Sequence, residues 1–101
     1  MKHLRFIGIT IDKKPVVSGD DVFTLKDTHG FPFTMSFVEC EKRGWVIDWQ
    51  GLVNSARSHG WPDFQTWDQI QEAFIDSGSW RNERPEIEKR IKLHILSNDI
   101  S

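Results

Sequence analysis

The first apolar positions of the chain predict a β strand. Five apolar residues partly alternate with polar or small ones: Leu4, Phe6, Ile7, Ile9 and Ile11. Three of the five are β-branched, and strands favour such residues. The segment Asp-Lys-Lys-Pro, residues 12–15, is typical of a turn. Val16 and Val17 could return as a short second strand, so residues 1–17 are expected to form a small β element.

From residue 18 onward the apolar spacing becomes helical. Ser18 or Asp20 can cap a helix whose narrow apolar face is Val22, Phe23 and Leu25. This helix is expected to stop at Gly30, where glycine tolerates a left-handed backbone. Phe31 then folds back toward Leu25, and Pro32 prevents continuation.

Two capping signals predict the next two helices. Ser36 and Glu39 have the spacing of a capping box, which predicts a short helix from Ser36 to Gly44, with Met35 packed on Cys40. Asp48 is the expected N-cap of a third helix that ends near Gly60. Its predicted buried stripe consists of Trp49, Leu52, Val53 and Ala56.

Two further helices are predicted in residues 61–101. Thr66 and Gln69 form another capping box, followed by Trp67, Ile70, Ala73 and Phe74 at helical spacing. Pro85 suits the first turn of the last helix, which is expected to bury Ile87, Ile91 and Ile95. The whole chain, residues 1–101, is therefore predicted to be one mainly α domain. We expect a compact bundle of four or five short helices, with a small N-terminal β strand or hairpin.

Composition narrows the class of protein. The chain has 101 residues, five Trp and seven Phe, which is enough for one core. Its net charge of -2 gives no overall attraction to nucleic acid. One cysteine excludes an internal disulfide and suits a reducing compartment. With no membrane-length apolar run and no signal-peptide pattern at the start, a cytoplasmic location is expected.

The segment 17–52, VSGDDVFTLKDTHGFPFTMSFVECEKRGWVIDWQGL, carries a pattern of fixed spacing. It resembles the segment of alanyl-tRNA synthetases that follows their class II catalytic core. That family has Gly, then Phe-x-Leu-x-Asp-Thr-x-Gly-Phe-Pro, a short helix ending in Gly, an apolar residue with Asp, and Gly with an apolar residue. The matching positions are Gly19, Phe23, Leu25, Asp27, Thr28, Gly30, Phe31, Pro32, Gly44, Ile47, Asp48, Gly51 and Leu52.

The resemblance implies that residues 18–60 are a helical segment from the region that recognises the acceptor stem of alanine tRNA. An acidic residue near the turn is associated with reading the stem, and Asp27 would carry that role. A carboxylate can accept hydrogen bonds from groups in the shallow groove of A-form RNA. Lys26, Arg43 and Arg57 would offset its repulsion from phosphate.

The chain also departs from the family. His29 stands where the family has Tyr, Thr34 replaces a carboxylate, and the segment 59–62 replaces a basic turn. Nothing in the sequence corresponds to the catalytic or editing motifs. Because no nucleophile with a base, acid pair or phosphate loop is visible either, we expect no enzyme activity.

Several residues have a structural interpretation beside the functional one. Asp27 could instead bond the free amides at the start of the next helix and so hold two helices together. His29 could be a pH-sensitive contact or general base, or only a polar surface residue. Cys40 is expected to be buried and inert. His3, His59 and His94 have no metal-ligand spacing with Cys40, so neither a metal nor a cofactor is expected.

The last basic cluster and the tryptophans leave alternatives open as well. Lys89 and Lys92 share a helix face and could meet phosphates, but the interleaved glutamates favour a salt-bridged surface. Trp49 and Trp67 fit buried stripes. The tryptophans at helix ends or in loops are the better candidates for an exposed contact surface: Trp45, Trp61 and Trp80.

Two functions therefore remain in competition. One is a small non-catalytic protein that binds a protein partner, of the kind that phages and mobile elements use as inhibitors or adaptors. The other is an RNA-binding module for a tRNA-like acceptor stem. The candidate binding residues are Lys26, Asp27, His29, Arg43, Trp45, Arg57 and Trp61. The partner and the oligomeric state do not follow from the sequence.

Overall fold

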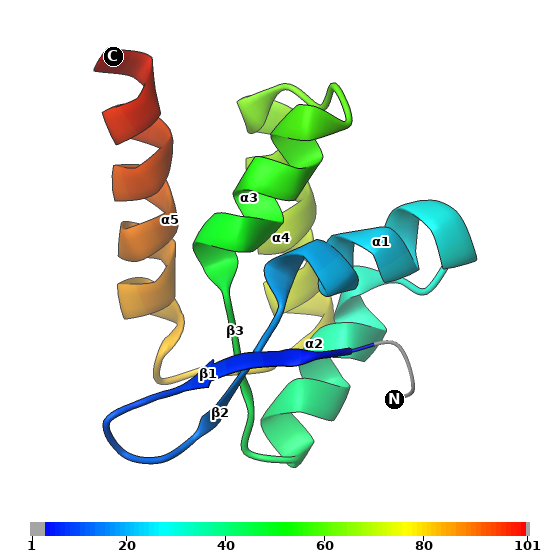
Figure 1. Ribbon diagram of the computed structural model, residues 1–101, viewed down its shortest axis with the longest axis vertical. Helices are drawn as coiled ribbons and strands as arrows, with labels where there is room; N and C mark the ends of the chain where they lie inside the picture. Colours follow the sequence, from blue (N-terminus) through cyan, green and yellow to red (C-terminus); the bar gives the residue numbers. More distant parts are fainter. Residues whose placement is uncertain (1–3, 101) are drawn as a thin grey trace.

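A computed structural model describes residues 4–100 of the chain, with side chains for residues 4–97 (Figure 1). His3 and the rest of residues 1–3 lie outside the described part, as does Ser101. The chain is mainly α with a small N-terminal sheet, which confirms the predicted fold class. The strands are β1 (Phe6–Ile9), β2 (Pro15–Val17) and β3 (Val46–Ile47). The helices are α1 (Gly19–His29), α2 (Phe33–Lys42), α3 (Trp49–Ser58), α4 (Asp63–Ser77) and α5 (Arg84–Ile100).

The sheet has the strand order β1-β2-β3. β1 and β2 form the expected antiparallel hairpin, with an irregularity between Phe6 and Gly8. β3 pairs with β2 in parallel, so that Val16 lies opposite Val46, and the chain reaches β3 through α1 and α2. The sequence analysis missed β3 because two residues cannot show the alternation that marks a strand. This order leaves β1 at an open edge of the sheet.

The turn after α1 has the predicted shape. Ser18 Oγ accepts a hydrogen bond from the Asp21 amide at 3.2 Å, which confirms Ser18 as the N-cap. Gly30 has φ of 67°, in the left-handed region, and the Phe31 N–H donates to the Leu25 carbonyl at 2.9 Å. The segment Asp-Thr-His-Gly-Phe-Pro, residues 27–32, is thus the end of α1 followed by Pro32, which prevents the helix from continuing.

Helix α3 also follows the sequence prediction. The Asp48 carboxylate accepts from the Gly51 amide at 3.1 Å, and the predicted stripe of Trp49, Leu52, Val53 and Ala56 is buried. At Gly19, the start of α1 lies against the start of α3. A Cβ at Gly19 would overlap the Asp48 carbonyl oxygen and the Leu52 nitrogen, so only glycine permits this approach.

The predicted N-caps of α2 and α4 are wrong by four residues. Both helices begin directly after a proline, Pro32 and Pro62, and neither has a side-chain cap. Proline presets a φ near -65° that suits the entry to a helix. Ser36 and Thr66, the predicted caps, lie inside their helices and are fully buried.

The packing expected beside the first of these caps is also wrong in part. Cys40 is fully buried, as predicted, but the Met35 side chain is 52% exposed and does not cover it. The Ser36 hydroxyl is buried without a hydrogen-bond partner.

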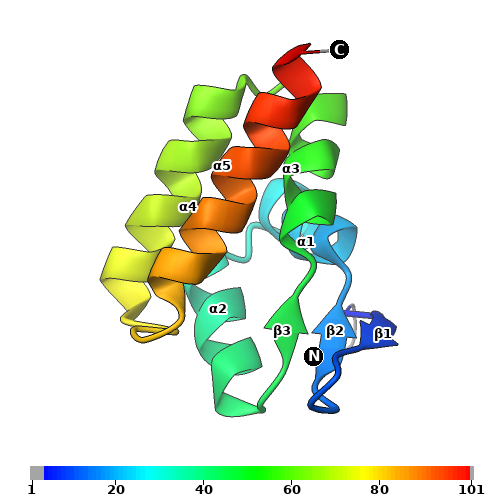
Figure 2. The same cartoon turned by 90° about the vertical axis from the view of Figure 1, so that its left-hand side faces the viewer.

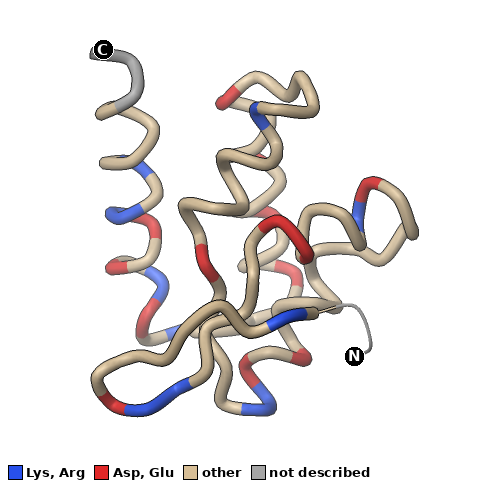
Figure 3. Tube along the Cα trace, in the orientation of Figure 1, with Lys and Arg blue, Asp and Glu red and all other residues tan. Residues whose placement is uncertain are grey.

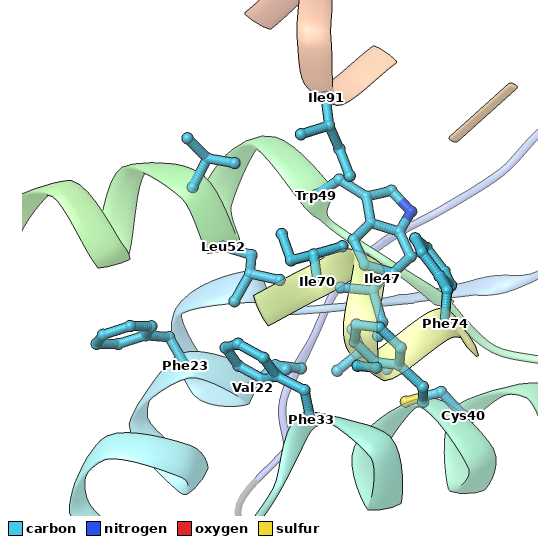
Figure 4. Close-up of a cluster of buried hydrophobic side chains, with 14 of the residues drawn as sticks. Val22, Phe23, Phe33, Cys40, Ile47, Trp49, Leu52, Ile70, Phe74 and Ile91 are labelled. Carbon is cyan, nitrogen blue, oxygen red and sulfur yellow. The ribbon is translucent and has the colours of Figure 1, made fainter. Parts of the chain in front are cut away.

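All five helices contribute to one core, in which the side chains converge between the helices and β3 (Figure 4). Its centre is an aromatic cluster in which Phe37, Trp49 and Phe74 lie with ring centroids 5.2–5.4 Å apart. Trp80 joins this cluster and is only 7% exposed, so the expectation that Trp80 belongs to an exposed surface is wrong. Within residues 4–100, no helix combines the length and apolar character needed to cross a membrane.

Candidate binding surfaces

The structure does not gather the predicted binding residues into one site. Lys26, Asp27 and His29 lie at the C-terminal end of α1, Arg43 caps α2, and Arg57 lies in the last turn of α3. Figure 1 shows these three helix ends at separate parts of the molecule, to the right, at the bottom and at the top. The chain therefore brings together Lys26, Asp27 and His29, but not the two arginines.

Asp27 is exposed and makes no hydrogen bond or ion pair within the described residues. Helix α2 begins without a side-chain cap, so the structural interpretation, in which Asp27 bonds the first amides of α2, is wrong. Its neighbour Lys26 places Nζ 5.3 Å from the centroid of the Phe33 ring. Glu72 and Asp76 line the same surface hollow as Lys26. The charge around Asp27 is therefore not strongly positive.

Arg57 holds the upper ends of three helices together. Its Nε and NH2 atoms donate to the two oxygens of Asp63 at 2.8 and 2.9 Å, and NH2 also approaches the Ile95 carbonyl at 3.4 Å. Bonded in this way, the guanidinium lowers the pKa of the Asp63 carboxyl below its ordinary value of 3.8. Arg57 is a link between α3, α4 and α5.

Trp61 packs where the α3–α4 turn meets α1 and α2. Its ring lies edge-on to Phe23, with centroids 5.0 Å apart, and 6.4 Å from Phe33. The side chain thereby connects the α3–α4 turn with α1 and α2. Trp61 is partly buried, so most of its role in this arrangement is packing.

Arg43 and Trp45 form a small cluster with Phe6. The Arg43 guanidinium is bonded to Glu39 at 2.7 Å and lies 5.2 Å from the centroid of Trp45. The bond from Arg43 lowers the pKa of the Glu39 carboxyl. Phe6 meets Trp45 edge-on at 4.9 Å and is 53% exposed.

The strand that carries Phe6 is unusually open. The four residues of β1 are all exposed, and Ile7 and Ile9 remain 57% and 66% exposed. The backbone groups of Thr10 bond to Lys13 and Lys14 in the hairpin. Since peptide groups alternate in a strand, those of Ile9 face the open edge. β1 is therefore an apolar edge strand that an extended segment could join.

Another apolar surface runs along α5 and at one end lies between α5 and α4, the two helices that are next to each other in Figure 2. One hollow of about 310 Å³ lies between α4 and α5, and an adjoining hollow of about 550 Å³ is lined by α5 residues alone. The two hollows share Lys92 and Leu96. We call this surface the α4–α5 groove. It is lined by Asp63, Phe64, Trp67, Pro85, Glu88, Lys89, Lys92, Leu93, Ile95 and Leu96.

The apolar side chains of the groove are largely uncovered. Phe64 is 72% exposed, Leu96 is 57% exposed and Leu93 is 55% exposed. The sequence analysis missed this surface because it followed only the inward isoleucines of α5. Leu93 and Leu96 lie outside that stripe. Apolar residues on the other faces of a helix are the sequence signal that could have revealed the groove.

The acidic side chains that line the groove have bonding partners, whereas its two lysines form no ion pair with a described residue. The Asp63 carboxylate is engaged by Arg57, and Glu88 accepts from Arg84 at 2.7 Å and from Gln71 at 2.9 Å. Lys89 and Lys92 form no ion pair with any described residue. Lys92 Nζ lies 5.3 Å from the centroid of Trp67. The groove is thus apolar, with two uncompensated positive charges at its margin.

A third hollow, of about 270 Å³, lies between the sheet and the first turns of α5. Val46, Ile47, Trp49 and Trp80 are among the residues that line it. Charged groups of both signs also line it: Lys14, Glu83, Glu86 and Arg90. This mixture gives no preference for a ligand of one charge.

Groups with potential chemistry are few in the described part of the chain. Within residues 4–100, no three His, Cys, Asp or Glu side chains are placed to hold a metal ion. Burial raises the pKa of the Cys40 thiol to about 11, so the thiol stays protonated at neutral pH. A protonated buried thiol is a poor nucleophile, as the sequence analysis expected for Cys40.

Comparisons with protein-family models, curated proteins and solved structures found no match for this chain. The likeness to alanyl-tRNA synthetases thus rests on residues 17–52 alone.

Proposed function

We propose that this chain is a non-catalytic protein-binding module and that the α4–α5 groove is its binding surface. The observation that carries the proposal is the exposure of Phe64, Leu93 and Leu96 in two adjoining hollows that meet at Lys92 and Leu96. Single exposed apolar residues are normal on a protein, but a clustered set at a hollow is typical of an interaction site.

Burial of these side chains by a partner would supply much of the binding free energy. Apolar area removed from water contributes about 25 cal/mol per Å², so each exposed leucine offers about 1–2 kcal/mol. An inhibitor or adaptor of the kind that mobile elements encode needs such a surface and no catalytic residues. The buried free Cys40 fits a reducing compartment such as the cytoplasm.

The basic residues give less support to nucleic acid as the main partner. In Figure 3 the Lys and Arg positions are scattered over several elements and interleaved with acidic ones. Affinity for a phosphate backbone grows with the number of cations that reach it together. An apolar groove gains more from a protein side chain than from a phosphate.

The proposal is tested by protein capture from a nuclease-treated lysate of the source cells. We compare the wild-type chain with Leu96→Glu, in the groove, and with Ile75→Glu as a matched control. Ile75 is 65% exposed on α4 but does not line the groove. A protein retained by wild type and Ile75→Glu but lost with Leu96→Glu supports the proposal. Capture that is unchanged in Leu96→Glu contradicts it.

The second candidate function is an RNA-binding module for a tRNA-like acceptor stem. It is favoured by Asp27, which is exposed and unbonded beside Lys26, next to a Gly30 turn of the shape that the resemblance requires. Titration with an alanine-tRNA acceptor minihelix at micromolar protein tests it. Salt-sensitive binding that is lost in Asp27→Asn would favour this function. Absence of salt-sensitive binding would contradict the RNA-binding function.

A further inference from the structure

We infer that the α4–α5 groove receives an amphipathic α-helix whose flanks carry Asp or Glu. This inference rests on the proposed function and names the chemistry of the partner segment. It is drawn from the length of the groove, the nature of its walls and the charge at its margin.

The length of the groove fits a short helix. Its two hollows follow α5 from Pro85 to Leu96 and overlap at Lys92 and Leu96. At a rise of about 1.5 Å per residue, this stretch of α5 is about 16 Å long. A partner helix of about three turns would cover it and could present apolar residues at positions i, i+3 or i+4, and i+7.

The walls of the groove favour a helix over an extended segment. The lining residues come from α4 and α5 in one hollow and from α5 alone in the other, and the backbone N–H and C=O groups of both helices bond within each helix. An extended segment would bring its own backbone groups against Phe64, Leu93 and Leu96 without partners, which costs free energy. A helix satisfies those groups internally. An extended partner would find backbone groups to pair with only at an open strand edge such as β1.

The margin of the groove favours acidic residues on that helix. Both carboxylates that line the groove are already engaged: Asp63 by Arg57, and Glu88 by Arg84 and Gln71. Lys89 and Lys92 lack an ion pair and project from the same face of α5. Because Arg57 and Arg84 neutralise the two carboxylates of the lining, Lys89 and Lys92 leave a local excess of positive charge, although the whole chain has a net charge of -2. Complementary Asp or Glu on the partner would speed association and fix its orientation.

A phosphate backbone would also be attracted by Lys89 and Lys92. Two cations give weak binding to RNA at physiological salt, and a phosphate would leave Phe64, Leu93 and Leu96 without apolar contacts. An acidic amphipathic helix satisfies both the lysines and the apolar side chains. RNA is therefore kept as an outcome of the test.

The test is a selection from a phage-displayed library of fully randomised linear peptides, which contains both helix-forming and extended, proline-containing sequences. The baits are wild type, Leu96→Glu, the control Ile75→Glu, and the double variant Lys89→Glu/Lys92→Glu. Circular dichroism of each bait shows that it is folded. Wild type and Ile75→Glu are expected to enrich peptides with apolar residues on one face and Asp or Glu beside them. These peptides should bind Leu96→Glu at least tenfold more weakly, and the double variant should select Lys or Arg flanks instead.

The other outcomes separate this inference from the proposed function. Peptides that depend on Leu96 but show no acidic preference, or are unchanged by the double variant, overturn the inference and leave the proposed function standing. Enrichment of extended, proline-containing peptides at the groove overturns it equally. If no enriched peptide depends on Leu96, both fail. If a control RNA hairpin binds wild type but not the double variant while no peptide is selected, phosphate is the occupant and the inference is wrong.

Discussion

Gly19 and Gly30 constrain the two ends of α1 for different reasons. At Gly30 the backbone has φ of 67°, a conformation that costs other residues about 1–2 kcal/mol, but a Cβ there would meet nothing within 4 Å. At Gly19 the backbone of α3 occupies the space that a Cβ would need. The first constraint is local, whereas the second fixes how closely two helices pack.

These two constraints predict different costs for alanine. Gly30→Ala should lower the free energy of unfolding by about 1 kcal/mol. Gly19→Ala should lower it by about 3 kcal/mol, because α1 must move away from α3. Gly8→Ala, in β1, has open space around the new Cβ and serves as the control. Urea unfolding measures all three, and equal losses at Gly19 and Gly30 would contradict the close approach.

The ion pair between Arg57 and Asp63 should make the free energy of unfolding depend on pH. Arg57 lowers the folded-state pKa of Asp63, so the ion pair contributes its full stability above the ordinary value of 3.8. That contribution is lost as the pH falls through the lowered pKa.

The matched variants for this pH dependence are Asp63→Asn and Asp68→Asn. Asp68 is an exposed residue of α4 without an ion pair in the described part of the chain. Asp63→Asn should be about 1 kcal/mol less stable than wild type at pH 7, with a difference that shrinks below pH 3.8. Urea unfolding from pH 7 to pH 3 measures it. A difference that stays constant, or that Asp68→Asn reproduces, would mean that Arg57 does not stabilise the fold through Asp63.

At the scale of elements, Ser18 and Ser36 were both expected to cap helices, and only Ser18 does. Ser18→Ala should therefore cost about 1 kcal/mol in the free energy of unfolding. Ser36→Ala should cost nothing or stabilise the chain, because it removes a buried hydroxyl that has no partner. Chemical denaturation of both variants decides the point. If Ser36→Ala lowers the free energy of unfolding as much as Ser18→Ala does, Ser36 contributes to stability as a helix cap would, and the expectation for Ser36 is wrong.

The elements that the sequence predicted well are those with unambiguous ends. Ser18, Gly30 and Asp48 each act as the sequence indicates, so α1 and α3 could be derived from local chemistry. In α2 and α4 a proline and the first residue of a capping box compete four residues apart, and burial of Ser36 and Thr66 in the core decides for the proline. Such burial depends on packing between elements, which no local pattern contains.

The binding surfaces were harder to predict for a related reason. Arg43 and Arg57 were expected to act with Asp27 because of the resemblance to the tRNA-recognition segment, but each helix carries its cation to a different end of the molecule. Helix α5 has apolar residues both on its buried stripe and away from it, so its pattern does not separate core from interface. The groove exists only once α4 and α5 lie together.

At the scale of the whole molecule, the described residues leave β1 and the α4–α5 groove as open apolar surfaces. The strand offers unpaired backbone groups, and the groove offers side chains and two unpaired lysines. The predicted RNA-binding residues, by contrast, are dispersed over three helix ends. We therefore propose the groove, rather than the dispersed basic residues, as the site for a protein partner.

Photo-crosslinking in the source cells tests this claim most directly. A benzophenone amino acid is placed at Leu93 in the groove, at Ile75 as an exposed control, and at Asp27 on the RNA-binding candidate. We predict a protein adduct from Leu93 that neither Ile75 nor Asp27 gives. An RNA adduct from Asp27, with no protein adduct from Leu93, would contradict the account.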